Sequence, residues 1–215
     1  KPTLTKKQRH KLRIQQVRRQ KIFLTCLFLL IVGCILLRFS KFSGRQKETH
    51  QINAACEAYR DEVSSEAAQY DMSDYVDLIL AVMMQESSGQ GTDPMQSSEG
   101  AYNTRYPQQP NGITDPSYSI SCGIQELKYA LEKAVCTGPT DLSKIRLALQ
   151  AYNFGADSYF AYLEENGQTV WTAQSAQAFA QMASGGTQRD EDDPLHDPAG
   201  PWDYGDQYYP DHVLR

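Results

Sequence analysis

An unbroken row of seven apolar residues runs from Leu78 to Met84 and stops at the polar sequence Q-E-S-S-G. A segment this apolar is either a buried helix or a central strand, and periodicity alone does not separate the two. Its Leu and Met residues favour a helix, Asp74 precedes the row, and Gly89 follows where a helix C-cap is expected. The row therefore predicts a buried helix of about three turns that carries Glu86 on its last turn.

The position of Glu86 has a chemical consequence. A carboxyl beside apolar side chains is poorly solvated, which raises its pKa, and the negative end of a helix dipole acts in the same direction. A Glu that stays protonated near neutral pH can donate a proton to a leaving oxygen, as the general acid does in glycoside hydrolysis. Most Glu residues at helix ends are solvated surface residues, so this pattern alone leaves both roles open for Glu86.

Charge is distributed unevenly along the chain. Residues 1–47 hold 13 of the 21 Lys and Arg and no acidic residue. Residues 48–215 hold the other 8 bases and all 26 acids, a formal charge of 8 − 26 = −18. A domain this acidic is a poor nucleic-acid binder, and the basic N-terminal arm is better explained by anionic lipid. We therefore expect no nucleic-acid partner.

Between these two parts lies the apolar segment 22–37, which is 16 residues long. As a helix it would span about 24 Å, slightly less than a hydrocarbon core of about 30 Å, and an extension to Phe42 would lengthen it. Because the flank before it is the more basic, the positive-inside rule predicts a basic cytoplasmic arm (1–21), a single transmembrane anchor (22–42), a stalk (43–50) and an extracellular domain (51–215). A cleaved signal peptide is the alternative, but no small-x-small cleavage site follows closely.

Apolar residues recur at helical spacing through most of the domain. No strand pattern competes with them, which predicts an all-α fold. A stretch of about thirty residues, Ser87 to Ser117, lacks periodicity, and a loop of this length is usually functional. The aromatic segment Trp202 to Leu214 is expected to pack back on the domain. The predicted helical stripes are 52–70, 120–134, 142–152, 159–163 and 171–183.

Cysteines and histidines indicate no metal centre. Cys56, Cys122 and Cys136 show no C-x-x-C spacing, and a Cys122–Cys136 disulfide would leave one thiol over. His196 and His212 stand among acidic residues but match no ligand pattern. We expect neither a metal nor an organic cofactor.

Three motifs in order carry a resemblance to a known superfamily. Glu86-Ser87, Met95-Gln96 and the A-Y-N-F-G sequence at 151–155 resemble the E-S, G-L-M-Q and A-Y-N-x-G blocks of goose-type lysozymes and soluble lytic transglycosylases. Together with the closing Y-G-D-Q-Y-Y-P-D-H-V-L-R, the chain from about residue 50 is similar to the lysozyme-like domain of membrane-anchored bifunctional cell-wall hydrolases of Gram-positive conjugative elements. Its second block reads D-P-M-Q, and the segment between the first two blocks is shorter than in typical transglycosylases.

This resemblance implies a lysozyme-like domain in which Glu86 is the general acid. Ser87 would support the helix end or bind substrate, and Gln96 would contact the sugar or the group left after bond cleavage. Tyr152 would touch Glu86 or line the cleft, although its place on a helical stripe fits a core aromatic equally well. Asn153 would bind a substrate amide.

The resemblance also implies the substrate, the β-1,4 bond between N-acetylmuramic acid and N-acetylglucosamine in peptidoglycan. Water activated by a second carboxylate would give an inverting muramidase, with Asp93, Glu99 and Asp115 as candidates. Attack by the sugar's own 6-hydroxyl would give a lytic transglycosylase. We favour the muramidase, acting at the outer face of the cell membrane with conjugative secretion machinery as a partner. A non-catalytic wall-binding or channel scaffold is the alternative class.

Overall fold

The computed structural model describes residues 52–193 and 196–215. The chain divides into two units, Lys1–Glu48 and Thr49–Arg215, and every described residue belongs to the second. The predicted arm, anchor and stalk therefore lie outside the described residues. None of the helices in the described part is long and apolar enough to cross a membrane.

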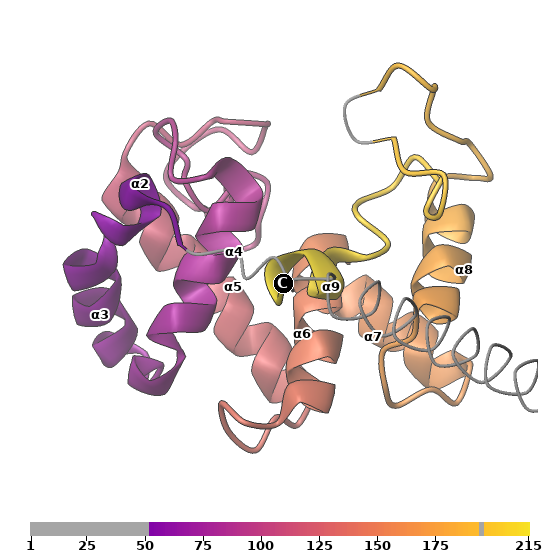
Figure 1. Cartoon of the computed structure of the whole chain (residues 1–215), viewed down its shortest axis with the longest axis horizontal. Coiled ribbons are helices and arrows are strands. Elements are labelled where there is room, and N and C mark those ends of the chain that lie inside the picture. The colour runs from indigo at the N-terminus through magenta and orange to yellow at the C-terminus, as the bar shows by residue number, and fades with distance from the viewer. Residues whose placement is uncertain (1–51, 194–195) are drawn as a thin grey trace, which may run out of the picture. The chain divides into compact units, whose positions relative to one another are not determined.

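Helices account for the regular structure of the described residues (Figure 1). The one extended pairing in these ranges is an isolated antiparallel bridge between Gln188 and Trp202. The predicted all-α class is thus confirmed for this part of the chain. The helices are α2 (Ala54–Glu57), α3 (Arg60–Gln69), the 3-10 helix η1 (Ser73–Tyr75), α4 (Val76–Ser87), α5 (Pro116–Lys133), α6 (Leu142–Phe154), α7 (Ala156–Glu165), α8 (Ala173–Ala183) and α9 (Tyr209–Val213).

Two details of the predicted helices were wrong. The stripe at 52–70 is two helices, because the Tyr59 N–H turns back to the Cys56 carbonyl at 3.0 Å and ends α2. Leu142, expected in the core, is 60% exposed. It is the first residue after the Asp141 N-cap, so it precedes the turn of α6 that reaches the core.

Helix α4 is the predicted buried helix, twelve residues long, and it lies in the apolar core. Its C-cap is Ser88, which already adopts a left-handed conformation (φ 56°), one residue before the predicted Gly89. Gly89 is also left-handed, and a Cβ there would lie 2.8 Å from the backbone nitrogen of Cys56. A glycine is therefore needed where the end of α4 approaches α2.

The C-terminal segment returns to the middle of the fold, as predicted. Helix α9 packs against both α6 and α4, and Figure 1 shows it between them. Tyr209, Pro210 and Val213 bury their side chains there. Because a five-residue helix has little stability of its own, this burial holds α9 in place.

A buried carboxylate organises the long loop after α4. Asp93 accepts hydrogen bonds from the backbone N–H groups of Ser97 (3.0 Å) and Ser98 (3.2 Å) and from the hydroxyls of Ser98 and Ser119 (2.6 Å). Its side chain is almost fully buried. The loop is thereby fixed to the start of α5, and its far end is tied in where the Ile113 N–H donates to Ser98 Oγ at 2.8 Å.

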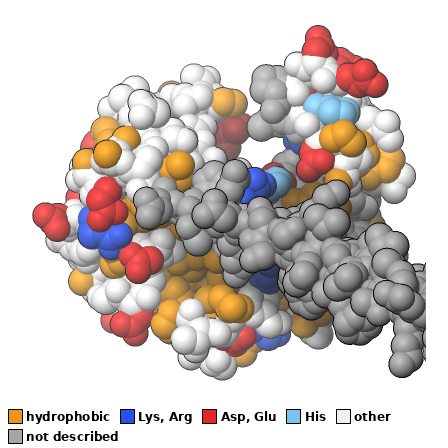
Figure 2. Space-filling view, in the orientation of Figure 1, with side chains coloured by type: hydrophobic (Ala, Val, Ile, Leu, Met, Phe, Trp, Pro, Cys, Tyr) orange, Lys and Arg blue, Asp and Glu red, His pale blue; other side chains and the backbone are white. Residues whose placement is uncertain are grey.

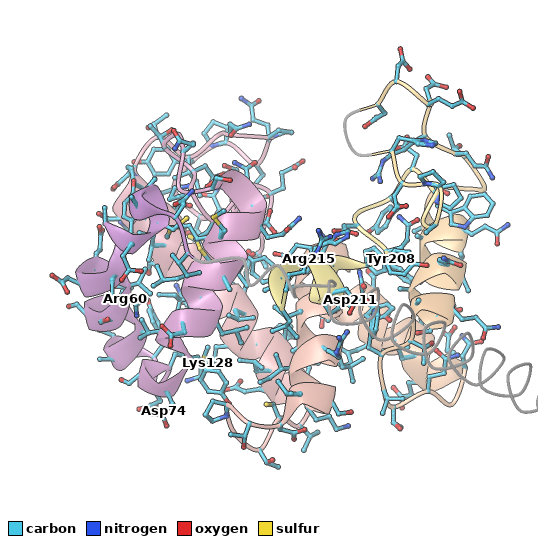
Figure 3. The ribbon with its side chains drawn as sticks, in the orientation of Figure 1. Arg60, Asp74, Lys128, Tyr208, Asp211 and Arg215 are labelled. Atoms are coloured by element: carbon cyan, nitrogen blue, oxygen red, sulfur yellow. The ribbon has the colours of Figure 1, made fainter. Side chains whose placement is uncertain are left out.

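We expect Asp93→Asn to destabilise the fold by about 3 kcal/mol, because an amide cannot accept from all four donors and leaves buried groups unpaired. Urea unfolding followed by circular dichroism measures the change. Asp74→Asn is the matched control, since Asp74 lies exposed in η1 and points away from the fold (Figure 3). Equal stability of the two variants would contradict this role for Asp93.

Candidate active site

A cavity of about 660 Å³ lies where the end of α4 meets the end of α6 and the C-terminal segment. Glu86, Gln96 and Asn153, three of the residues named from sequence, line it together. Asp206 and His212 line its other side. Figure 2 shows blue and pale blue side chains in the hollow between the two halves of the fold, and Arg189, Arg215, His196 and His212 are the basic residues of the lining.

The Glu86 carboxyl is half-buried at the last turn of α4, where the sequence placed it. Burial raises the pKa of Glu86 to about 7, and the negative charges of Asp206 and Asp93 act in the same direction. A hydrogen bond from Tyr209 opposes them by favouring the ionised form. Glu86 therefore exchanges its proton near neutral pH, as a general acid must.

Tyr209 is the nearest partner of Glu86 and was not identified from sequence. Its hydroxyl donates to Glu86 Oε1. Its ring is buried and stacks on Tyr152, with centroids 6.3 Å apart. Tyr152 in turn donates to the Met95 carbonyl at 2.9 Å. Tyr152 thus lies behind Tyr209 and joins α6 to the loop after α4. This arrangement is closer to a core aromatic residue than to one that lines the cleft.

Ser87 and Gln96 make contacts within the protein. Ser87 Oγ donates to the Pro94 carbonyl at 2.8 Å and accepts from the Gly89 N–H at 3.0 Å, which supports the helix end. Gln96 has a left-handed backbone (φ 49°), and its side-chain amide donates to the Asp93 carbonyl at 2.9 Å. Its side chain remains exposed at the cavity wall.

Asn153 joins the end of α6 to the C-terminal segment. Its Oδ1 accepts from the Asp206 N–H at 2.7 Å. Gly205 approaches so closely that a Cβ there would lie 2.6 Å from this oxygen. The side-chain NH₂ of Asn153 is the part that remains for a ligand.

The three carboxylates proposed from sequence as a second catalytic group do not line the cavity. All four hydrogen bonds of Asp93 are internal and its side chain is 1% exposed. Asp115 caps α5 by accepting from the Ser117 N–H at 3.1 Å. Glu99 is exposed on the loop. Asp206 and Asp197 are the carboxylates that do share the cavity with Glu86.

Asp206 and Tyr209 were missed, and His212 was considered only as a metal ligand, because no local pattern distinguishes them. They belong to the closing motif noted above, Y-G-D-Q-Y-Y-P-D-H-V-L-R, which carried the resemblance without a role for any residue. Nor does the disulfide that spacing allowed occur. Within the described residues Cys56, Cys122 and Cys136 are free thiols.

A second buried carboxyl, Glu126 on α5, lies beneath the loop. Its Oε1 is buried without a hydrogen-bond partner among the described residues. A Cβ on Gly100 would lie 1.4 Å from that oxygen, so the loop backbone covers it directly. Burial raises the pKa of Glu126 to about 7, while a backbone hydrogen bond from Tyr102 opposes the rise.

Replacement of Tyr209 by Phe should raise the pKa of Glu86 above 7, because the hydrogen bond that favours the ionised carboxylate is lost. A ¹³C NMR titration of the Glu86 carboxyl measures this pKa in both proteins. Tyr204→Phe is the control, since its hydroxyl donates to the Phe154 carbonyl and not to Glu86. A Glu86 pKa near the ordinary 4.5 in the parent protein, or one unchanged by Tyr209→Phe, would contradict this description.

Glu126 should make the fold more stable at low pH. Because its pKa is about 7 in the folded protein and 4.5 as the ordinary value, its contribution is complete below about pH 4.5 and is lost as the pH rises through 7. The full difference is roughly 3 kcal/mol. We expect Glu126→Gln to gain stability relative to the parent between about pH 5 and pH 8.5. Thermal unfolding at pH 5 and at pH 8.5 tests this, and Glu99→Gln is the control because Glu99 is exposed. If the stability of Glu126→Gln changes with pH in the same way as that of the parent, the prediction is wrong.

Comparison with known proteins agrees with this fold. The family model described as Lysozyme-like matches residues 54–214. The bifunctional muramidase/DL-endopeptidase CwlT of Bacillus subtilis is 34% identical over 168 residues, which cover 78% of this chain and 43% of CwlT. The uncharacterized membrane protein YocA of the same organism is 40% identical over 115 residues, or 52% of this chain and 45% of YocA.

Two further matches also cover only part of each relative. A pneumococcal vaccine antigen A homolog of Streptococcus pyogenes is 37% identical over 110 residues, covering 51% of this chain and 50% of the homolog. A Staphylococcus aureus crystal structure, of a protein described as similar to a lipoprotein of the NLP/P60 family, superposes with a TM-score of 0.62 at 29% identity. That match covers 76% of this chain and 53% of the other. The chain thus spans about half the length of these relatives.

Proposed function

The chain belongs to the lysozyme-like family, and we propose that it cleaves peptidoglycan glycan strands as an N-acetylmuramidase. The observation that carries this proposal is Glu86, a half-buried carboxyl whose pKa is about 7, facing a cavity of about 660 Å³. Similarity to a bifunctional muramidase over 78% of this chain supports the same reaction.

Glu86 is the proposed general acid. In its protonated form it donates to the oxygen of the β-1,4 bond between N-acetylmuramic acid and N-acetylglucosamine as the sugar develops oxocarbenium character. The Tyr209 hydroxyl holds the carboxyl in place and stabilises the carboxylate left after proton transfer. Gln96 and the Asn153 amide are proposed to bind the sugar or its N-acetyl groups, since both line the cavity. Ser87 and Tyr152 are proposed to support the site without touching the sugar, because their hydrogen bonds hold the end of α4 and the loop after it in place.

A lytic transglycosylase is the second candidate. Its 6-hydroxyl nucleophile requires no second carboxylate, and the absence of Asp93, Glu99 and Asp115 from the cavity lining favours it. The presence of Asp206 in that lining favours hydrolysis. We retain hydrolysis as the main proposal for this reason. The scaffold alternative gives no account of a protonated Glu86 at an open cavity.

The proposed location is the outer face of the cell membrane. The apolar segment 22–37 with its basic flank supports a single anchor with a cytoplasmic N-terminus. Similarity to a relative named as a membrane protein agrees with it. Local wall opening during conjugative transfer is the proposed setting, and the motif resemblance is its sole support.

The test is mass spectrometry of muropeptides released from peptidoglycan by the purified full chain. We expect reducing-end N-acetylmuramic acid, and we expect Glu86→Gln to bind peptidoglycan while its rate falls by about 10²–10⁴-fold. Products with a 1,6-anhydro ring, lighter by one water, would instead establish the transglycosylase. Glu99→Gln is the control, because that carboxyl is exposed outside the cavity lining. Cleavage by Glu86→Gln at the parent rate would end the general-acid assignment.

A further inference from the structure

We propose that His212, oriented by Asp206, is the general base that takes the proton of the attacking water. This inference rests on the proposed muramidase function. It supplies the catalytic base for which the sequence analysis named Asp93, Glu99 and Asp115 as candidates. It assigns to Asp206 a positioning role and to His212 contact with the nucleophile.

The two side chains form a directed pair in the cavity. Asp206 Oδ2 lies 2.5 Å from His212 Nδ1, and Asp206 Oδ1 accepts from the Tyr208 N–H at 2.8 Å. Both oxygens of Asp206 are therefore engaged, while Nε2 of His212 has no hydrogen-bond partner among the described residues. The side chains are 27% and 23% exposed, so the pair is sheltered but open to the cavity that it lines.

Charges around the pair favour the tautomer that a base needs. Burial raises the pKa of Asp206, but the Tyr208 N–H, Arg215 and Arg189 favour its ionised form. An ionised carboxylate only accepts hydrogen bonds, so it favours the His212 tautomer with the proton on Nδ1, and in the neutral imidazole of this tautomer Nε2 holds the lone pair. An acidic residue fixes a catalytic imidazole in the same way in Ser-His-Asp triads.

The chain holds Asp206 firmly from two positions on α6. The backbone N–H of Asp206 donates to Asn153 Oδ1 at 2.7 Å, and its carbonyl accepts from Gln150 Nε2 at 2.7 Å. Gln150 is fully buried and also accepts from Trp171 Nε1 at 2.8 Å. The pair is therefore mounted on the core and not on a free loop.

Helix α9 relates this pair to the general acid. Tyr209 and His212 are three residues apart and so share one face of α9. Tyr209 donates to Glu86, while His212 reaches the same cavity from the next turn. No hydrogen bond joins Glu86 to Asp206 or His212 among the described residues. An inverting glycosidase keeps its acid and its base apart, so that a sugar and a water fit between them.

In the proposed step the water oxygen forms a bond to the anomeric carbon while the bond from that carbon to the leaving oxygen breaks. The leaving oxygen keeps the electron pair and takes the proton of Glu86. Nε2 of His212 takes one proton from the water, and Asp206 stabilises the resulting imidazolium. Transfer of that proton through solvent to Glu86 restores both groups, so the net reaction consumes one water.

His196 is the competing imidazole, because it lines the same cavity. Its Nδ1 is buried with no hydrogen-bond partner among the described residues. The neighbouring Asp197 uses Oδ1 to accept from the Ala199 N–H at 2.8 Å. In the described part of the chain no carboxylate is hydrogen-bonded to Nδ1 of His196, which is the reason for assigning the base to His212.

The decisive variant is His212→Ala, tested in the full chain with and without added imidazole. We expect the rate of reducing-end product formation to fall by about 10²–10⁴-fold and imidazole to restore part of it, because the small base enters the space left by the ring. A rate within about threefold of the parent would overturn the proposal. The proposal would also be overturned if His212→Ala binds peptidoglycan but imidazole restores none of its rate, or if imidazole restores the rate of His196→Ala and not that of His212→Ala.

Asp206→Asn tests the positioning role separately. We expect kcat to fall with KM nearly unchanged, since an amide NH₂ donating to Nδ1 would turn the lone pair away from the cavity. Asp211→Asn is the matched control. Asp211 lies on α9 (Figure 3). It pairs with Arg146 at 2.7 Å and is absent from the cavity lining. Equal kcat in the Asp206 and Asp211 variants would overturn the role of Asp206.

Failure of the two proposals is distinguishable. A parent protein that releases no saccharide overturns the muramidase function, and the base assignment with it. A parent that releases reducing-end product while His212→Ala does so equally well overturns the base assignment alone. Release of 1,6-anhydro product by the parent overturns the proposal that His212 takes a proton from an attacking water.

Discussion

The hydrogen bond between Tyr209 and Glu86 joins residues 123 positions apart, and the candidate site depends on it. It connects the last turn of α4 to the C-terminal helix α9 across the core. The bond lies where burial has already raised the pKa of Glu86, so the Tyr209 donor limits how far that pKa rises. The same contact brings α9, and with it Asp206 and His212, to the cavity.

Three carboxyls, one buried and two half-buried, illustrate how environment separates residues of similar chemistry. Asp93 receives four hydrogen bonds and serves as the anchor of a loop. Glu126 lies under the loop backbone with one oxygen unpartnered among the described residues. Glu86 has one donor and an open face toward the cavity. Because Glu86 is the one of these three that combines a raised pKa with access to a ligand, it is the one suited to acid catalysis.

Local features of the fold could be predicted from sequence. The apolar row before Glu86 and the helical stripes at 120–134, 142–152 and 159–163 depend on nearby residues, so helices α4 to α7 lie close to where expected. The break between α2 and α3 could not be predicted, because a single i→i+3 bond at Tyr59 overrides an otherwise regular stripe.

The candidate site was predictable in part for the same reason. Glu86 and Ser87 follow from the end of one helix. Asp93 was assigned as a potential base because sequence shows a carboxylate but not the donors that bury it, one of which, Ser119, comes from the next helix. Asp206 and His212 depend on where a five-residue helix docks, and no periodic pattern specifies that.

This dependence on docking couples the whole site to one element. Helix α9 is held by the burial of Tyr209, Pro210 and Val213 and by the Arg146–Asp211 ion pair. A local opening of α9 would remove the Tyr209 donor from Glu86 and carry His212 away from Asp206, which α6 holds in place, in the same event. Short terminal elements open at lower free energy than the core, so both contacts would be lost before the domain unfolds. Catalytic competence therefore follows the docking of α9 more closely than the global stability of the domain.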